Sequence, residues 1–182
     1  RDPTVDATMS APGSIRYTLR HDTFRGLCSG GTVYFIGNAM QTMAATWEMV
    51  EATGSGFLAA LVQTAVFLPM FLFSLPAGVL ADITDRRRLI LAALVAQALA
   101  VALLTALLAA DLAGPVLLLL LTFITGCSTA LITPAWNSTI VDSVPRDELA
   151  PAITVVSIAY NSARALGPSL ADYGLTLKRV RR

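Results

Sequence analysis

The sequence predicts an all-α membrane protein, a polytopic bundle of about five transmembrane helices. The chain of 182 residues is 55% hydrophobic and only 14% charged, which is too apolar for an ordinary soluble domain. Its charged residues leave long gaps between Glu51 and Asp82, between Arg88 and Asp111, and between Asp111 and Asp142. Each gap exceeds the roughly 20 residues that a helix needs to cross the hydrocarbon core.

Composition also excludes several other classes of protein. Buried core helices of a large soluble protein would be shorter and would keep a polar face toward solvent. Cys28 and Cys127 lie far apart in apolar stretches, without the spacing of a disulfide framework or a metal site. A net charge of +1 gives no concentrated basic surface for a nucleic acid. The sequence therefore predicts no metal, no cofactor and no nucleic-acid partner, and a lipid bilayer as its surroundings.

Five apolar segments follow one another along the chain. The first is the least apolar, the second contains two prolines, and the third is rich in leucine and alanine. The fourth opens with a run of leucines and then becomes polar, and the fifth is interrupted by Arg164. The segments span residues 27–50, 56–81, 89–110, 115–141 and 149–170.

The basic residues of the loops predict the orientation of these segments. Arginines occur in the leader, in the loop at Arg86–Arg88 and at Arg146, whereas the two intervening loops contain no lysine or arginine. Because basic loops stay in the cytosol, the N-terminus is expected to be cytosolic. The fifth segment conflicts with this pattern, since crossing would place the basic tail outside and Arg164 would cost about 2.5 to 3.5 kcal/mol on insertion.

The chain divides into a cytosolic leader (residues 1–25), an incomplete N-terminal transmembrane bundle (26–171) and a basic tail (172–182). The leader is polar and mixed in charge, so it is not a cleavable signal peptide and is expected to be loosely ordered. Because the chain begins with Arg1 and not with Met, its true start is expected to be missing.

A motif lies between the second and third segments, where Gly78 begins the stretch GVLADITDRRR. A glycine permits close helix approach, a carboxylate at a helix end can pair with a cation, and arginines anchor a cytosolic loop. The stretch resembles the G-x-L-x-D-R-x-G-R-R signature of the major facilitator superfamily, although Ile83 replaces an arginine and Asp85 a glycine. The matching residues are Gly78, Leu80, Asp82, Arg86 and Arg87.

Three further stretches resemble the branch of that superfamily that contains enterobactin-type exporters and transmembrane secretion effectors. They are Leu75–Asp82 with Asp85–Arg88, Pro134–Trp136 with Val144–Leu149, and Asn161 with Ala163–Arg164 and Gly167–Pro168. The resemblance implies the N-terminal half of a twelve-helix facilitator fold, in which the motif, through Asp82, switches the protein between inward-facing and outward-facing states. It also implies a secondary active transporter of the plasma (inner) membrane that exports small amphipathic compounds, such as drugs or siderophores, with protons as a candidate coupling ion.

Two polar helix faces are candidate substrate sites. In the first segment and in the fourth, polar residues recur at spacings of three and four, which places them on one face of each helix. Such a face either lines water or hydrogen-bonds to another helix, and the resemblance favours cavity lining. The candidate residues are Asn38, Gln41, Thr122, Thr125, Thr129, Thr133 and Asn137.

The fifth segment adds Asn161 and Arg164 to the candidates. Arg164 is the charged residue deep inside a segment, where it could bind an anionic substrate group, pair with a carboxylate of the bundle, or extend toward the interface. Glu48 is a candidate proton carrier, but a glutamate near the outer end of a segment needs no functional explanation.

Two other functions compete with transport. A membrane-embedded transferase would need clustered carboxylates or histidines to hold a metal and a phosphate, but the single histidine, His21, lies in the leader. No enzyme is therefore predicted. The alternative is a small structural or regulatory membrane protein that associates with full-length transporters. Since the tail is basic where the family would continue into a sixth helix, the chain is expected not to transport by itself.

Overall fold

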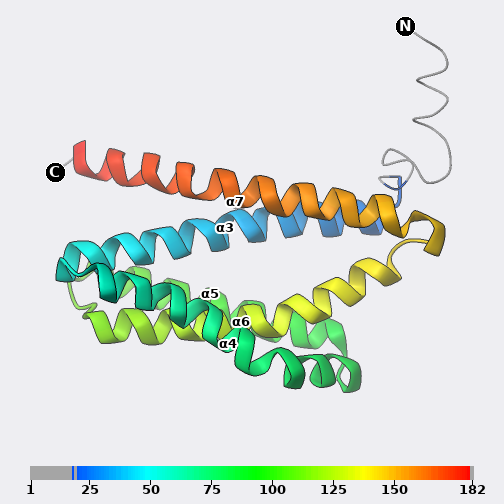
Figure 1. Cartoon of the computed structure of the whole chain (residues 1–182), viewed down its shortest axis with the longest axis horizontal. Coiled ribbons are helices and arrows are strands. Elements are labelled where there is room, and N and C mark those ends of the chain that lie inside the picture. The colour runs from blue at the N-terminus through cyan, green and yellow to red at the C-terminus, as the bar shows by residue number, and fades with distance from the viewer. Residues whose placement is uncertain (1–17, 19, 181–182) are drawn as a thin grey trace, which may run out of the picture. The chain divides into compact units, whose positions relative to one another are not determined.

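The computed structural model describes residues 18 and 20–180, without the side chains of residues 74, 75, 77, 78, 80–82, 168 and 171–180. Throughout this part of the chain the regular structure is helical, which confirms the all-α prediction (Figure 1). The elements are α3 (Asp22–Thr53), α4 (Gly56–Ile83), α5 (Arg86–Ala109), α6 (Pro115–Asp142), the 3-10 turn η1 (Arg146–Glu148) and α7 (Leu149–Val180).

The helices form two compact units, described here one at a time. The central unit comprises residues 41–137, and the terminal unit comprises residues 1–40 and 138–182. Helices α3 and α6 each contribute residues to both units.

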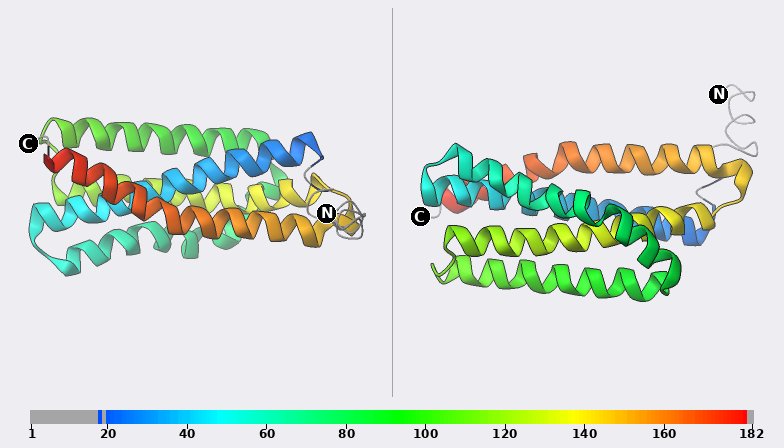
Figure 2. Two further views of the ribbon diagram at one scale, coloured as in Figure 1. Left: turned by 90° about the horizontal axis from the view of Figure 1, so that it is seen from above. Right: turned by 60° about the horizontal axis from the view of Figure 1, so that its bottom comes forward.

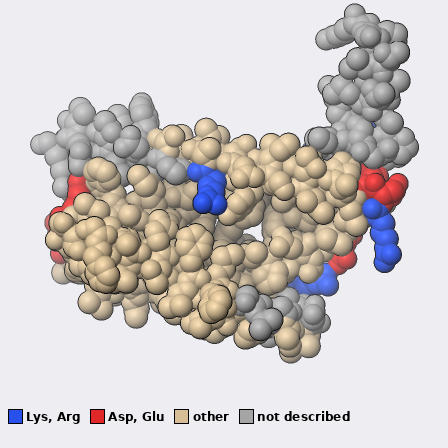
Figure 3. Space-filling view, in the orientation of Figure 1, with Lys and Arg blue, Asp and Glu red and all other residues tan. Residues whose placement is uncertain are grey.

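Three helices are long and apolar enough to cross a membrane: α4 through Gly56–Phe73, α5, and α6. In the described part of the chain α3 and α7 do not meet this criterion, because polar residues such as Asn38 and Gln41 interrupt α3 and Arg164 interrupts α7. Figure 3 shows one face on which uncharged residues make up most of the described surface. The chain is thus a multi-pass helical membrane protein with a strongly apolar centre.

Short turns with capping side chains join the helices. Gly54 adopts a positive φ of 65° between α3 and α4, a conformation that glycine reaches without strain. The Ser55 hydroxyl then accepts a hydrogen bond from the Leu58 N–H (3.3 Å), which caps the start of α4. Helix α6 begins with Pro115, whose missing N–H would have no helical partner at that position.

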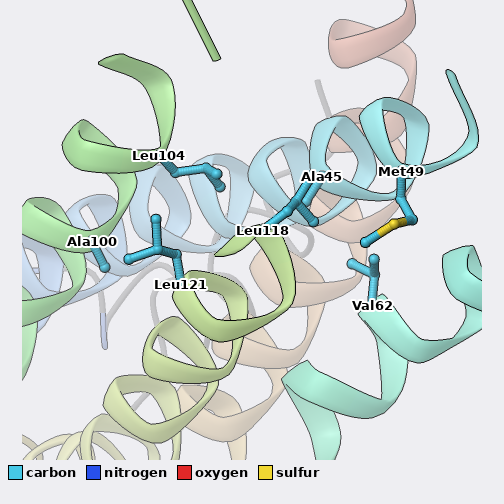
Figure 4. Close-up of a cluster of buried hydrophobic side chains, with 7 residues drawn as sticks. All are labelled: Ala45, Met49, Val62, Ala100, Leu104, Leu118 and Leu121. Carbon is cyan, nitrogen blue, oxygen red and sulfur yellow. The ribbon is translucent and has the colours of Figure 1, made fainter. Parts of the chain in front are cut away.

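A cluster of apolar side chains forms the core of the central unit, and all four of its helices contribute (Figure 4). Inside a bilayer such a cluster stabilises the bundle through close van der Waals packing, since lipid is as apolar as the side chains. The cluster consists of Ala45, Met49, Val62, Ala100, Leu104, Leu118 and Leu121.

Helices α4 and α6 approach very closely at Gly126. A Cβ atom at this position would lie 2.8 Å from the carbonyl oxygens of both Ala65 and Val66, and 3.1 Å from Cγ of Pro69. Pro69 has no N–H to offer the Ala65 carbonyl four residues earlier, and prolines inside helices cause bends. The bend of α4 is visible in Figure 2. Glycine therefore permits α6 to pack directly against the backbone of α4.

Helices α3 and α7 lie side by side in the terminal unit (Figures 1 and 2). The rings of Phe35 and Tyr160 meet edge to face, with centroids 5.0 Å apart. Further along both helices, a Cβ at Gly167 would lie 2.5 Å from Cβ of Ala39. Since the residue numbers of both partners increase together, the two helices run parallel.

Helix boundaries differ from prediction at both ends of the bundle. Helix α3 begins at Asp22, inside the predicted leader, and an ion pair between Arg25 and Asp22 (2.9 Å) spans its first turn. Helix α7 continues past the predicted end near Leu170 to Val180. Five of the ten added residues are alanine, leucine, lysine or arginine, which favour helix. Residues 1–17 of the predicted leader lie outside the described part of the chain.

Candidate functional site

Four polar residues of the central unit lie one helical turn from the apolar cluster. Gln41 precedes Ala45 by four residues, and Thr122 follows Leu118 by four. Because α3 and α6 run in opposite directions (Figure 1), both steps lead toward the same end of the unit. We call this set the polar layer; it consists of Gln41, Gln97, Thr122 and Thr125.

Part of the polar layer has no hydrogen-bond partner in the described part of the chain. Both amide atoms of Gln41 and the hydroxyl of Thr122 are buried and unpaired. Thr122 is 0% exposed. Each unpaired buried polar group costs about 1 to 3 kcal/mol of stability. Such a cost is explained if another polar molecule occupies these positions in the working protein.

The polar layer has no ionisable group among its members. Among the described side chains of residues 41–137, the charged ones lie near helix ends: Glu48, Glu51, Asp111 and the segment 85–88. Amides and hydroxyls both donate and accept hydrogen bonds. This arrangement therefore suits uncharged polar groups such as hydroxyl, ether and carbonyl oxygens.

The predicted polar face of α6 is not uniform. Thr125 is buried, Thr129 and Thr133 are half-buried, and Asn137 is exposed. The three hydroxyls donate to backbone carbonyls of their own helix: Thr125 to Thr122 (2.7 Å), Thr129 to Thr125 (3.0 Å) and Thr133 to Thr129 (2.8 Å). Threonine satisfies its hydroxyl in this way inside membrane helices. Thr122 differs from these three residues because its hydroxyl has no such partner.

The remaining cavity candidates lie in the terminal unit. Asn38 is half-buried on α3, whereas Asn161 and Arg164 are exposed on α7. The Asn161 amide donates to the Ser157 carbonyl (2.8 Å). The candidate residues are thus divided between two units, and the polar layer is the set that lies one helical turn from the apolar cluster of the central unit. Among the described residues, no group of three His, Cys, Asp or Glu side chains could hold a metal ion.

The predicted switch motif occupies the end of α4 and the start of α5. The surroundings of Gly78, Leu80 and Asp82 lie outside the described residues, while Arg86 is partly buried and Arg87 is exposed. The structure gives a role to Asp85, which departs from the family pattern. Its Oδ1 accepts hydrogen bonds from the N–H groups of Arg87 (2.9 Å) and Arg88 (3.4 Å), so Asp85 caps α5.

We expect Asp85→Ala to lower the free energy of unfolding by about 1 kcal/mol, because the cap acceptor is lost. Asp85→Asn keeps an acceptor and should behave like the wild type. The ion pair from Asp85 to Arg88 is long, 3.7 Å, and exposed, so its loss should matter little. Titration of the micelle-bound chain with dodecyl sulfate, followed by circular dichroism, measures the difference. If Asp85→Ala and Asp85→Asn lower the free energy of unfolding equally, the effect comes from the negative charge of Asp85 and not from the cap.

Sequence reasoning missed a contact between His21 and Glu148. Nε2 of His21 lies 3.4 Å from Oε1 and 3.3 Å from Oε2 of Glu148. The Glu148 side chain is only 3% exposed. The two residues are 127 positions apart, so no local spacing could indicate the pair. Each one immediately precedes a long helix, α3 and α7 respectively.

The protein is thus a helical membrane protein with buried hydrogen-bonding side chains in its central unit. Residues 14–178 match the model of the transmembrane secretion effector family, which is part of the major facilitator superfamily. The chain belongs to this family of transporters, and members of the superfamily are not enzymes. The predicted resemblance is confirmed.

Two curated relatives are similar to part of the chain. Both are macrolide efflux protein A, one from Streptococcus pyogenes and one from its serotype M6. Each is 32% identical over 128 residues, which cover 69% of this chain and 31% of the relative. The aligned region thus spans about a third of the relatives' length. No solved structure shows a significant match.

Proposed function

We propose that the chain is part of a secondary active transporter that exports small amphipathic molecules, and that the polar layer contacts the substrate. The family and the macrolide efflux relatives support export. The observation that supports the polar layer as the substrate contact is that the Gln41 amide and the Thr122 hydroxyl are buried and unpaired. These groups lower stability as they stand, and a bound polar group would satisfy them.

The proposal also covers the membrane location, the orientation and the conformational switch of the protein. The protein lies in the plasma (inner) membrane with its N-terminus in the cytosol, since its arginine-containing loops fall on the leader side. The motif at Gly78, Leu80, Asp82, Arg86 and Arg87 switches the protein between inward-facing and outward-facing states. Protons are the proposed coupling ion. Alternating access in the superfamily requires two halves, and the aligned region of this chain covers 31% of each macrolide efflux relative.

A binding experiment on the chain in lipid nanodiscs tests the polar layer. Erythronolide, an uncharged macrolide aglycone, is titrated while the fluorescence of Trp47 and Trp136 is recorded. We expect Thr122→Val and Gln41→Leu each to weaken binding about five- to tenfold, the effect of one lost hydrogen bond. The same variants should unfold no more easily than the wild type, because each loses an unpaired buried polar group.

Thr105→Val is the matched control. Its hydroxyl is exposed on α5 and donates to the Val101 carbonyl (2.8 Å), so removing it should leave binding unchanged. Unaltered erythronolide affinity in both polar-layer variants would contradict the assigned site. In cells without macrolide pumps, the chain alone should not reduce drug accumulation. Reduced accumulation would contradict the requirement for a second half.

A further inference from the structure

The starts of α3 and α7 are joined by a buried carboxylate and the single histidine of the chain. Glu148 is 3% exposed, whereas His21 is 39% exposed and reaches solvent. Nε2 of His21 faces both carboxylate oxygens, at 3.4 and 3.3 Å. Oε2 of Glu148 accepts no hydrogen bond within the described part of the chain. The carboxylate therefore depends on His21.

Other charged groups near the pair are engaged elsewhere or exposed. On α3, Arg25 pairs with Asp22 at 2.9 Å. Arg20, which precedes α3, has an interaction of its own. In η1, Arg146 and Asp147 are exposed. Asp142, at the end of α6, is exposed and also has an interaction. Among these described neighbours, only His21 pairs with Glu148.

We propose that His21 and Glu148 form a proton-operated clasp between the first turns of α3 and α7. A protonated imidazole attracts the buried carboxylate, and a buried charge without a partner is strongly unfavourable. Histidine is the side chain whose charge ordinarily changes between about pH 5 and 8. Loss of one proton from the imidazole removes the charge that compensates Glu148. The clasp therefore holds at the acidic end of this range and opens at the alkaline end.

Opening is confined to the helix starts. Farther along the parallel pair, α3 and α7 remain joined by the ring contact of Phe35 with Tyr160 and by the close approach of Ala39 and Gly167. Neither contact contains a titratable group that changes charge near neutral pH. The clasp thus links pH to the position of η1 and the first turn of α7 while the helix pair stays assembled.

Hydrogen–deuterium exchange of the whole chain in nanodiscs tests the clasp. Exchange rates of residues 21–27 and 146–153 are compared at pH 6 and pH 8, each corrected for intrinsic chemical exchange. We expect protection to fall about tenfold at pH 8, which corresponds to the loss of one favourable charge interaction. Residues 35–39 and 160–167 should keep their protection.

Three variants separate the clasp from other pH effects. His21→Lys keeps a cation at both pH values and should show protection that does not change with pH. His21→Gln and Glu148→Gln should both lack the pH-dependent change. Equal wild-type protection at pH 6 and pH 8 would overturn the proposal, as would a full pH-dependent change in His21→Gln. Since His21 is partly exposed, its variants test the proposal even if Glu148→Gln does not fold.

Discussion

Gly126→Ala is expected to lower the free energy of unfolding by about 2 to 3 kcal/mol, as overpacking of a tight interior does. The added methyl would lie 2.8 Å from two carbonyl oxygens of α4 and 3.1 Å from the ring of Pro69. Backbone atoms and a proline ring cannot rotate away, so α6 must move from α4. Chemical unfolding in detergent, with circular dichroism as the readout, measures the loss.

Gly56→Ala is the matched control for this prediction. Gly56 begins α4, the helix that Gly126 contacts, and a Cβ there would meet nothing within 4 Å. Alanine favours helix over glycine by up to about 1 kcal/mol, so this variant should be neutral or slightly more stable. An equally small effect at Gly126 would show that α4 and α6 do not pack as described.

Gly167→Ala is expected to separate α3 from α7 and to cost about 2 kcal/mol. Its methyl would lie 2.5 Å from Cβ of Ala39, which belongs to a side chain with no freedom to move. The reciprocal change offers a direct test. In the double variant Ala39→Gly/Gly167→Ala the methyl is moved from one helix to the other, and most of the lost stability should return.

A double-mutant cycle measures this compensation, because residues in direct contact show coupling energies that distant residues lack. Gly37→Ala is the control, since a Cβ at Gly37 on the same α3 would meet nothing within 4 Å. Losses that simply add in the double variant would contradict the contact between Ala39 and Gly167.

The helical membrane fold could be predicted from sequence because it depends on local patterns. The charge-free gaps that end at Asp82, Asp111 and Asp142 place α4, α5 and α6 within a few residues of their observed bounds. The start of α3 was harder to predict, since Asp22 and Arg25 are polar and an ion pair offsets their cost at the helix end. A polar turn that extends a helix beyond its apolar stretch does not raise the hydropathy of the sequence, so hydropathy cannot indicate it.

The candidate site was only partly predictable for a different reason. Spacing identified the polar face of α6, but it could not distinguish Thr122 from Thr125, Thr129 and Thr133, which differ in whether the hydroxyl reaches a backbone carbonyl. Contacts such as His21 with Glu148 join distant parts of the chain and depend on how helices pack. These properties belong to the folded bundle and not to any one segment.

The length of α3 has a consequence for how the protein matches the bilayer. Its 32 residues extend about 48 Å at about 1.5 Å per residue, against a hydrocarbon thickness of about 30 Å. Arg25 and Glu48 are 23 residues apart, or about 35 Å along the helix axis. Although α3 is not among the helices apolar enough to count as candidate spans, an upright α3 is long enough to place the two charges in opposite headgroup layers. Thinner membranes would require α3 to tilt.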